Sequence, residues 1–129
     1  MSSIEAFIQN SLDNAYFNEI FELNISDEVC DKIQKQSGLN VKKYRFIIEA
    51  QYVRHIRNRH EEDLFLLSKI ETILNTFDKV EKSLTRNSQT GKTDISLVFE
   101  KKINEDITKM IAIRIIKYKF LSLKTLYRK

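Results

Sequence analysis

Two histidines and three arginines lie within seven residues of one another, and their side chains suit phosphoryl chemistry. In order along the chain, this segment reads Arg54-His55-Ile56-Arg57-Asn58-Arg59-His60. Histidine is the side chain best suited to proton transfer near neutral pH. Cleavage of RNA by its own 2′-hydroxyl needs a base for that proton, an acid for the leaving oxygen and cations for the phosphorane charge. The segment therefore offers every group that such a metal-independent reaction requires.

Helical spacing separates the two histidines. At about 100° per residue, His60 falls on the apolar face with Val53 and Ile56, whereas His55 falls at the border of that face. Arg57 falls on the flank opposite to His55. His60 is then either a hydrogen-bonded core histidine or a proton carrier, and His55 is either a solvent-facing residue or the acid/base group.

Charge is unevenly divided along the chain. Residues 1–40 contain seven acids and two bases and so carry a formal charge of −5, although the whole chain carries +4. Residues 107–129 contain seven basic residues and no acid. This distribution suggests a face that attracts phosphate, against the alternative of an ordinary solvated Lys/Arg surface. The acidic start is a candidate cover for that face, or a docking surface for an immunity protein or a larger assembly.

The spacing of apolar residues changes along the chain and predicts an α+β fold. Spacings of three and four predominate before residue 80, and a period of two follows residue 94. The expected elements are helices over Ile4–Ile20, Ser26–Gly38, Ala50–Glu62 and Leu64–Phe77, a strand over Lys43–Glu49, a loop over Thr85–Asp94, strands over Ile95–Glu100, Lys109–Tyr118 and Phe120–Tyr127, and a turn at Asn104–Asp106. N-terminal helices followed by a C-terminal antiparallel β-sheet would form a single domain over residues 1–129, with an acidic helical segment (1–40) and a core (41–129).

The composition excludes several classes of protein. The single cysteine, Cys30, allows no disulfide within the chain and is interpreted as a packing residue. One cysteine and two histidines also supply no Cys/His metal site, so neither a metal nor a cofactor is expected. No secretory signal and no apolar run of about 18 residues are present. We therefore expect a cytoplasmic location and no membrane partner.

Residues 44–60 (YRFIIEAQYVRHIRNRH) resemble a known strand-then-helix signature. They are similar to the phage and polymorphic-toxin branch of the barnase–EndoU–colicin–RelE (BECR) ribonucleases, in which a His-Ile pair is followed by a basic residue and a second histidine. His55-Ile56 and Arg59-His60 match that pattern. The family's proline-aspartate-hydrophobic step lacks its proline here, where the chain reads Thr76-Phe77-Asp78-Lys79-Val80. The resemblance extends over about residues 44–128 and leaves the acidic start unexplained.

The last expected strand carries the other part of the resemblance. The family places a threonine there, with an aromatic residue two positions later, and Thr125 and Tyr127 match. Their period-two spacing puts both side chains on one face. The same spacing predicts that Thr125 shares a face with Leu121 and Leu123. An ordinary strand threonine and a sheet-edge aromatic residue are the alternative interpretations.

The resemblance implies a division of roles among these side chains. Proton transfer falls to His55, His60 or both, and contacts with the phosphate or a base fall to Thr125 and Tyr127. The phosphate-binding cations would be Arg57, Arg59, Lys102 and Arg114, although a solvated surface is the alternative for the last two. No metal would be bound.

The function expected from this resemblance is that of a metal-independent endoribonuclease, of toxin or phage-effector type. Its partners would be RNA, with tRNA as one candidate, and an immunity or antitoxin protein. The alternatives are a non-catalytic RNA-binding module that uses Phe99, Tyr118, Phe120 and Tyr127 as a platform, and a phage interaction protein with a degenerate nuclease fold.

Overall fold

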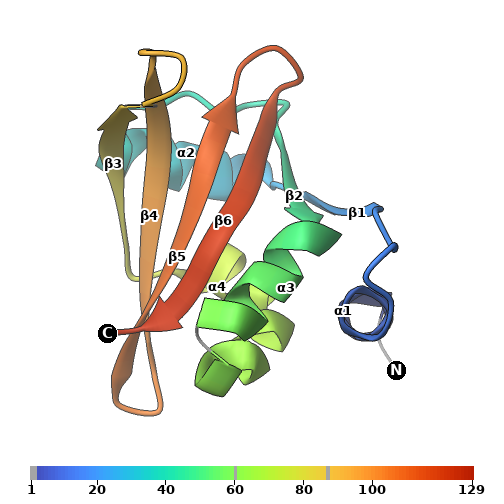
Figure 1. Ribbon diagram of the computed structural model, residues 1–129. Helices are drawn as coiled ribbons and strands as arrows, with labels where there is room; N and C mark the ends of the chain where they lie inside the picture. The colour runs from blue at the N-terminus through green and yellow to red at the C-terminus, as the bar shows by residue number, and fades with distance from the viewer. Residues whose placement is uncertain (1–2, 60, 87) are drawn as a thin grey trace.

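Helices precede most of the strands along the chain (Figure 1). The computed structural model describes residues 3–59, 61–86 and 88–129. The helical elements are α1 (Ser3–Asp13), α2 (Asp27–Ser37), α3 (Ala50–Arg59), the 3-10 helix η1 (Glu61–Lys69) and α4 (Ile70–Thr76). The strands are β1 (Ile20–Asn24), β2 (Arg45–Glu49), β3 (Lys79–Arg86), β4 (Thr93–Ile103), β5 (Asp106–Ile115) and β6 (Phe120–Arg128). The α+β class expected from the sequence is confirmed.

The strands form one sheet in the order β1-β2-β6-β5-β4-β3. All neighbouring strands are antiparallel except β2 and β6, which pair in parallel with Arg45 opposite Phe120. The expected C-terminal antiparallel sheet is confirmed for β3–β6, and β2 adds one parallel pairing to it. A parallel pair needs a crossover, and here the chain between β2 and β6 supplies it through the helices α3 and α4 and the meander β3–β5.

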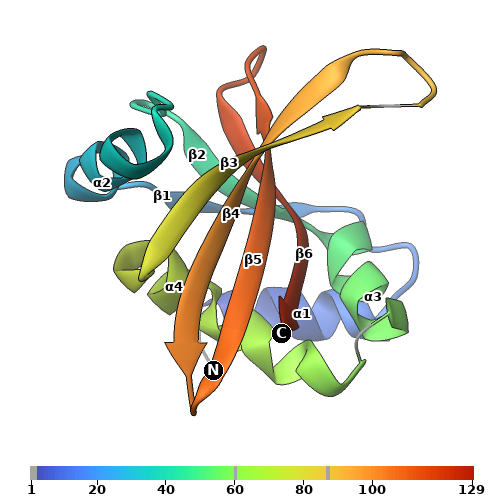
Figure 2. The ribbon, with the colours of Figure 1, turned by 90° about the vertical axis from the view of Figure 1, so that its left-hand side faces the viewer.

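Helices α2 and α4 cover one face of the sheet, and α3 lies beside β6. In Figure 1, α2 and α4 lie behind the sheet, and Figure 2 shows β3 and β4 bending away from α2 toward the open side. Phe46, Phe77 and Phe99 meet between these layers, with ring centroids of Phe77 and Phe99 5.1 Å apart in an edge-to-face arrangement. At most 1% of each of these side chains is exposed. The core therefore lies on the helix-covered face, and the open face is available for ligands.

The helix expected over Ile4–Ile20 ends at Asp13, and Ile20 begins strand β1 instead. Carbonyl groups at the end of a helix need donors other than the helix itself. Arg54 of α3 donates hydrogen bonds to the carbonyls of Ser11, Asn14 and Phe17, at 2.9, 3.3 and 3.1 Å. This long-range contact stabilises the end of α1. The segment 1–40 is consequently not all helical, because it contains an edge strand.

The end signals of α2 were correctly identified from the sequence. The Ser26 side chain accepts a hydrogen bond from the Val29 amide, as an N-cap does. Gly38 ends the helix with a φ of 81°, a left-handed conformation that glycine adopts at little cost. Both signals act within a few residues, which explains why the sequence alone located them.

Two boundaries differ from expectation in the middle of the chain. The helix expected to reach residue 62 ends at Arg59, and η1 follows. Strand β3 was not predicted, and its pairing with β4 from Lys79–Glu100 to Arg86–Thr93 shortens the expected loop. Because β3 is an edge strand with polar side chains, no apolar alternation marks it in the sequence. None of the described helices is long and apolar enough to cross a lipid bilayer.

Candidate active site between α3 and β6

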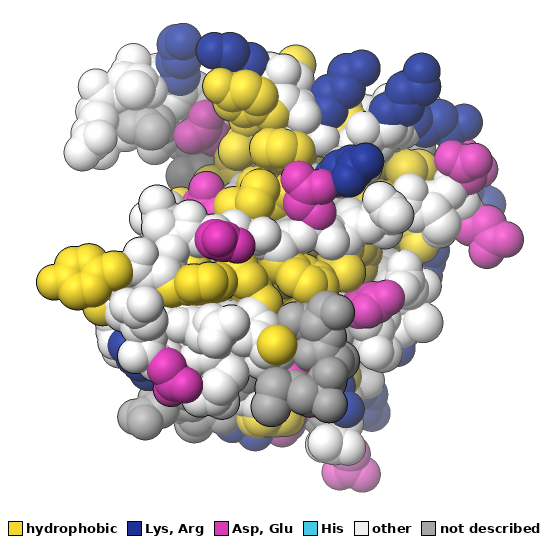
Figure 3. Space-filling model, turned by 90° about the vertical axis from the view of Figure 1, so that its right-hand side faces the viewer, with side chains coloured by type: hydrophobic (Ala, Val, Ile, Leu, Met, Phe, Trp, Pro, Cys, Tyr) yellow, Lys and Arg dark blue, Asp and Glu magenta, His cyan; other side chains and the backbone are white. Residues whose placement is uncertain are grey.

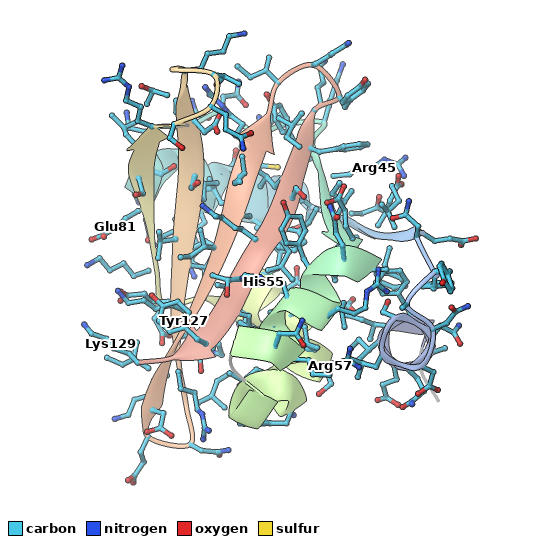
Figure 4. The ribbon with its side chains drawn as sticks, viewed as in Figure 1. Arg45, His55, Arg57, Glu81, Tyr127 and Lys129 are labelled. Carbon is cyan, nitrogen blue, oxygen red and sulfur yellow. The ribbon has the colours of Figure 1, made fainter. Side chains whose placement is uncertain are left out.

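Helix α3 follows β2 without a loop, and this junction fixes the orientation of His55. Ala50, Val53 and Ile56 are fully buried in the core, while His55 is exposed. The helix packs against β6. Figure 4 shows His55 on the side of α3 that faces β6, on the same side of the sheet as Tyr127. His55 therefore lies on the exposed side of α3, and its role in proton transfer stays a prediction.

Tyr52 lies one helical turn before His55 and contacts it. Their ring centroids are 6.4 Å apart with an interplanar angle of 82°. Burial, and then the carboxylate of Glu49, raise the pKa of the Tyr52 phenol. Tyr52 consequently remains a hydrogen-bond donor at neutral and moderately alkaline pH. Tyr52 was not singled out from the sequence.

A β-bulge in β6 decides which way its C-terminal side chains point. Ile111 of β5 is opposite Thr125, but the next residue, Ala112, is opposite Leu123, so the register shifts by one residue. After the shift, Leu126 joins Leu123 in the core. The prediction that Thr125 shares a face with Leu121 and Leu123 was therefore wrong. Thr125 and Tyr127 do share a face with each other, as expected, and it is the open one.

The hydroxyl of Thr125 is buried and has no hydrogen-bond partner among the described residues. An unsatisfied buried polar group costs free energy and calls for a specific reason. Here the hydroxyl lies on the open face of the strand beside α3. The described residues therefore leave this hydroxyl without a partner, although its oxygen is not exposed to solvent.

Lys109 adds a cation that the sequence did not single out. It lies opposite Tyr127 in the β5–β6 ladder and forms an ion pair with Glu100 of β4, with Nζ and Oε1 3.2 Å apart. Both side chains are about one-fifth exposed. In the sequence, Lys109 is one of many lysines in an acid-free run, and only strand register distinguishes it.

The structure does not place all the expected phosphate-binding cations beside α3 and β6. Arg57 donates a hydrogen bond to the Leu12 carbonyl at 3.0 Å, and Figure 4 shows it on the α1 side of α3. Arg114 is opposite Leu121 on the helix-covered face of the sheet, with its Nε buried. Lys102 shares the open face but lies on β4, two strands from β6. The side chain of Arg59 and all of His60 lie outside the described residues.

The expected aromatic platform is also incomplete. Phe99 is fully buried in the core and cannot contact a ligand on the open face. Tyr118 is 61% exposed, and its ring stacks on Phe120 with centroids 5.9 Å apart. Two of the expected aromatics are thus at the β5–β6 hairpin, and Tyr127 is at the opposite end of β6.

Neither acidic helix covers the place where α3 packs against β6. Helix α1 packs on the Arg54 flank of α3, and α2 lies behind the sheet (Figure 1). Figure 3 shows apolar side chains across the side formed by α1 and β1, with Lys and Arg gathered along the upper edge. The acidic start therefore does not act as a cover in this conformation.

The described residues contain no cluster of His, Cys, Asp and Glu that could hold a metal ion. Cys30 is buried, as expected for a packing residue. Burial, followed by the charges of Asp27 and Asp31, raises the pKa of its thiol. A thiol held protonated in this way is a poor nucleophile.

Comparison with known proteins gives one match. The family described as phage-Barnase-EndoU-ColicinE5/D-RelE like nuclease3 (PBECR3) matches residues 24–129. Neither the curated proteins nor the solved structures provide a significant match. The matched region includes α3 and β6 and excludes α1. The chain therefore belongs to the PBECR3 family of nucleases.

Proposed function

We propose that this protein is a metal-independent endoribonuclease that cleaves RNA by attack of the 2′-hydroxyl on the adjacent phosphate. The observation that supports the proposal is the packing of α3, which carries His55, against β6, which carries Thr125 and Tyr127. These are the side chains that the BECR resemblance assigned to catalysis. Membership of a nuclease family agrees with this chemistry.

Each group has a defined task in the proposed reaction. His55 exchanges a proton with the 2′-hydroxyl or with the leaving 5′-oxygen. The Thr125 hydroxyl donates a hydrogen bond to a non-bridging phosphate oxygen, and Tyr127 contacts the phosphate or stacks on a base. Lys109, adjacent to Tyr127, supplies positive charge close to the phosphorane. His60 and Arg59 remain candidates for the second proton carrier and a phosphate-binding cation.

The test is cleavage of end-labelled tRNA and rRNA by the purified protein in EDTA. We expect defined fragments with 2′,3′-cyclic phosphate ends. A matched substrate with a single 2′-deoxynucleotide at a mapped cleavage site should resist cleavage there and be cut elsewhere. Cleavage at the deoxynucleotide, or cleavage that requires added Mg²⁺, would contradict the proposed mechanism.

A Thr125→Val variant should separate activity from stability. Valine has a similar shape and lacks the buried hydroxyl that has no partner among the described residues. The free energy of unfolding should therefore stay the same or rise by about 1 kcal/mol. RNA cleavage should fall roughly 10- to 100-fold, because one hydrogen bond to a charged phosphate is lost.

Urea unfolding and kcat/KM measured on the same preparation check this prediction. Thr125→Ser restores the hydroxyl and should retain most of the activity. Full activity in Thr125→Val would show that this hydroxyl does not contact the phosphate.

A further inference from the structure

The turn between β5 and β6, residues 116–119, exposes apolar and basic side chains together. Ile116 and Tyr118 are 63% and 61% exposed. The Tyr118 ring stacks on the Phe120 ring at an interplanar angle of 28°. The Lys117 Nζ lies 5.4 Å from the centroid of the Tyr118 ring. A ring backed by a second ring is held in one orientation and presents a flat face to a ligand.

Charges around this turn favour an anionic partner. Lys117 and Lys119 flank Tyr118, and residues 107–129 contain no acid. Glu22, two strands from β6, is ion-paired with Arg45 at 2.8 Å. Lys and Arg side chains gather along the upper edge in Figure 3, the end at which the β5–β6 hairpin lies in Figure 1.

The hairpin is continuous with the candidate active site. Strand β6 begins at Phe120, two residues after Tyr118, and runs to Thr125 and Tyr127. At about 3.3 Å per residue, Tyr118 lies roughly 20 Å from Thr125 along the strand. Lys124 lies between the two places, beside the bulge. A single strand bound at Thr125 can therefore reach the hairpin with a few nucleotides.

We propose that Tyr118, with Lys117 and Lys119, forms a base-stacking subsite for single-stranded RNA flanking the cleaved bond. This inference rests on the proposed ribonuclease function and adds a determinant of substrate binding to it. Stacking on an exposed aromatic ring is tolerant of sequence and contributes to single-strand affinity, while the lysines contact phosphates. The subsite would favour unpaired RNA that extends beyond the cleavage site.

Binding is tested with a 2′-O-methylated single-stranded RNA of about 12 nucleotides, which the enzyme cannot cleave and which fits a typical single-strand site. Tyr118→Ala should raise the Kd roughly 5- to 100-fold in fluorescence anisotropy. Tyr16→Ala is the matched control, because Tyr16 is 94% exposed and lies between α1 and β1. Its Kd should equal that of the unaltered protein.

A spectroscopic arm reports on stacking itself. The chain contains no tryptophan, so Tyr118→Trp introduces a single indole. RNA should quench its fluorescence, whereas Tyr16→Trp should show no quenching. In Lys117→Gln/Lys119→Gln, the slope of log K against log salt should shrink by about 1.4, the value for two phosphate contacts to a single strand.

Cleavage kinetics distinguish failure of this inference from failure of the proposed function. Tyr118→Ala should lower kcat/KM for a long substrate and leave a dinucleotide substrate unaffected, since the dinucleotide does not reach the hairpin. An equal loss on both substrates, or an unchanged Kd in Tyr118→Ala, would overturn the subsite and leave the ribonuclease intact. If the protein cleaves neither substrate but binds RNA through Tyr118, the ribonuclease proposal fails and the stacking surface stands.

Discussion

A His55→Ala variant is expected to lose about 10²- to 10⁴-fold in kcat/KM for RNA cleavage, the usual contribution of a positioned acid or base. His55 is exposed on α3 beside β6, whereas the residues that anchor the helix, Val53 and Ile56, are fully buried. The substitution therefore removes the proton carrier and leaves the packing in place. The free energy of unfolding should change by no more than about 0.5 kcal/mol.

Initial rates of cleavage and urea unfolding of the same preparation measure these two effects. Asn58→Ala is the matched control, because Asn58 is an exposed residue one turn further along α3. It should cleave RNA at the normal rate. Imidazole added to His55→Ala should restore part of the activity, since a free base can enter the exposed site. If His55→Ala retains full activity, the proton carrier is another residue, and His60 becomes the first to be substituted.

The second large effect concerns stability. Phe99→Ala is expected to lower the free energy of unfolding by about 3–5 kcal/mol, the range for deletion of a large buried aromatic side chain. Phe99 is fully buried, and its ring meets Phe46 at 6.5 Å and Phe77 at 5.1 Å between centroids. The substitution would leave a cavity at the point where β2, β4 and the end of α4 meet. A marginally stable domain would lose a large share of its stability.

Urea unfolding monitored by circular dichroism checks this value. Phe65→Ala is the control, because Phe65 is 47% exposed and contacts Arg128 at 5.1 Å from the guanidinium carbon to the ring centroid. Loss of the Phe65 side chain should lower the free energy of unfolding by no more than about 1 kcal/mol. An equal fall in the free energy of unfolding for Phe99→Ala and Phe65→Ala would contradict this prediction. It would mean that the cluster around Phe99 is not the centre of the core.

Several features followed from the sequence because they depend on neighbouring residues. The caps of α2 at Ser26 and Gly38 are local signals, and the border position of His55 follows from helical spacing. The strand-then-helix signature and the pair Thr125 and Tyr127 also indicate the nuclease group from the sequence alone. The α+β class followed from the change in apolar spacing along the chain.

Other features depend on contacts between distant parts of the chain. Arg54 and Arg57 look equivalent to any other basic residues of α3, yet they donate hydrogen bonds to carbonyls at the end of α1 about 40 residues earlier. Arg114 falls on the covered face because of the strand register. Strands β1 and β3 are edge strands whose short or polar sequences carry little alternation.

The candidate site combines features that the sequence predicts with features that only tertiary contacts decide. The sequence shows that His55, Thr125 and Tyr127 are present and that Thr125 and Tyr127 share a face, but strand spacing alone put that face on the wrong side of β6. Only the tertiary structure decided that α3 packs beside β6, that Lys109 is opposite Tyr127, and that a bulge turns Thr125 to the open face. Spacing describes one element at a time, whereas strand pairing and bulges are set by the free energy of burying side chains from both partners.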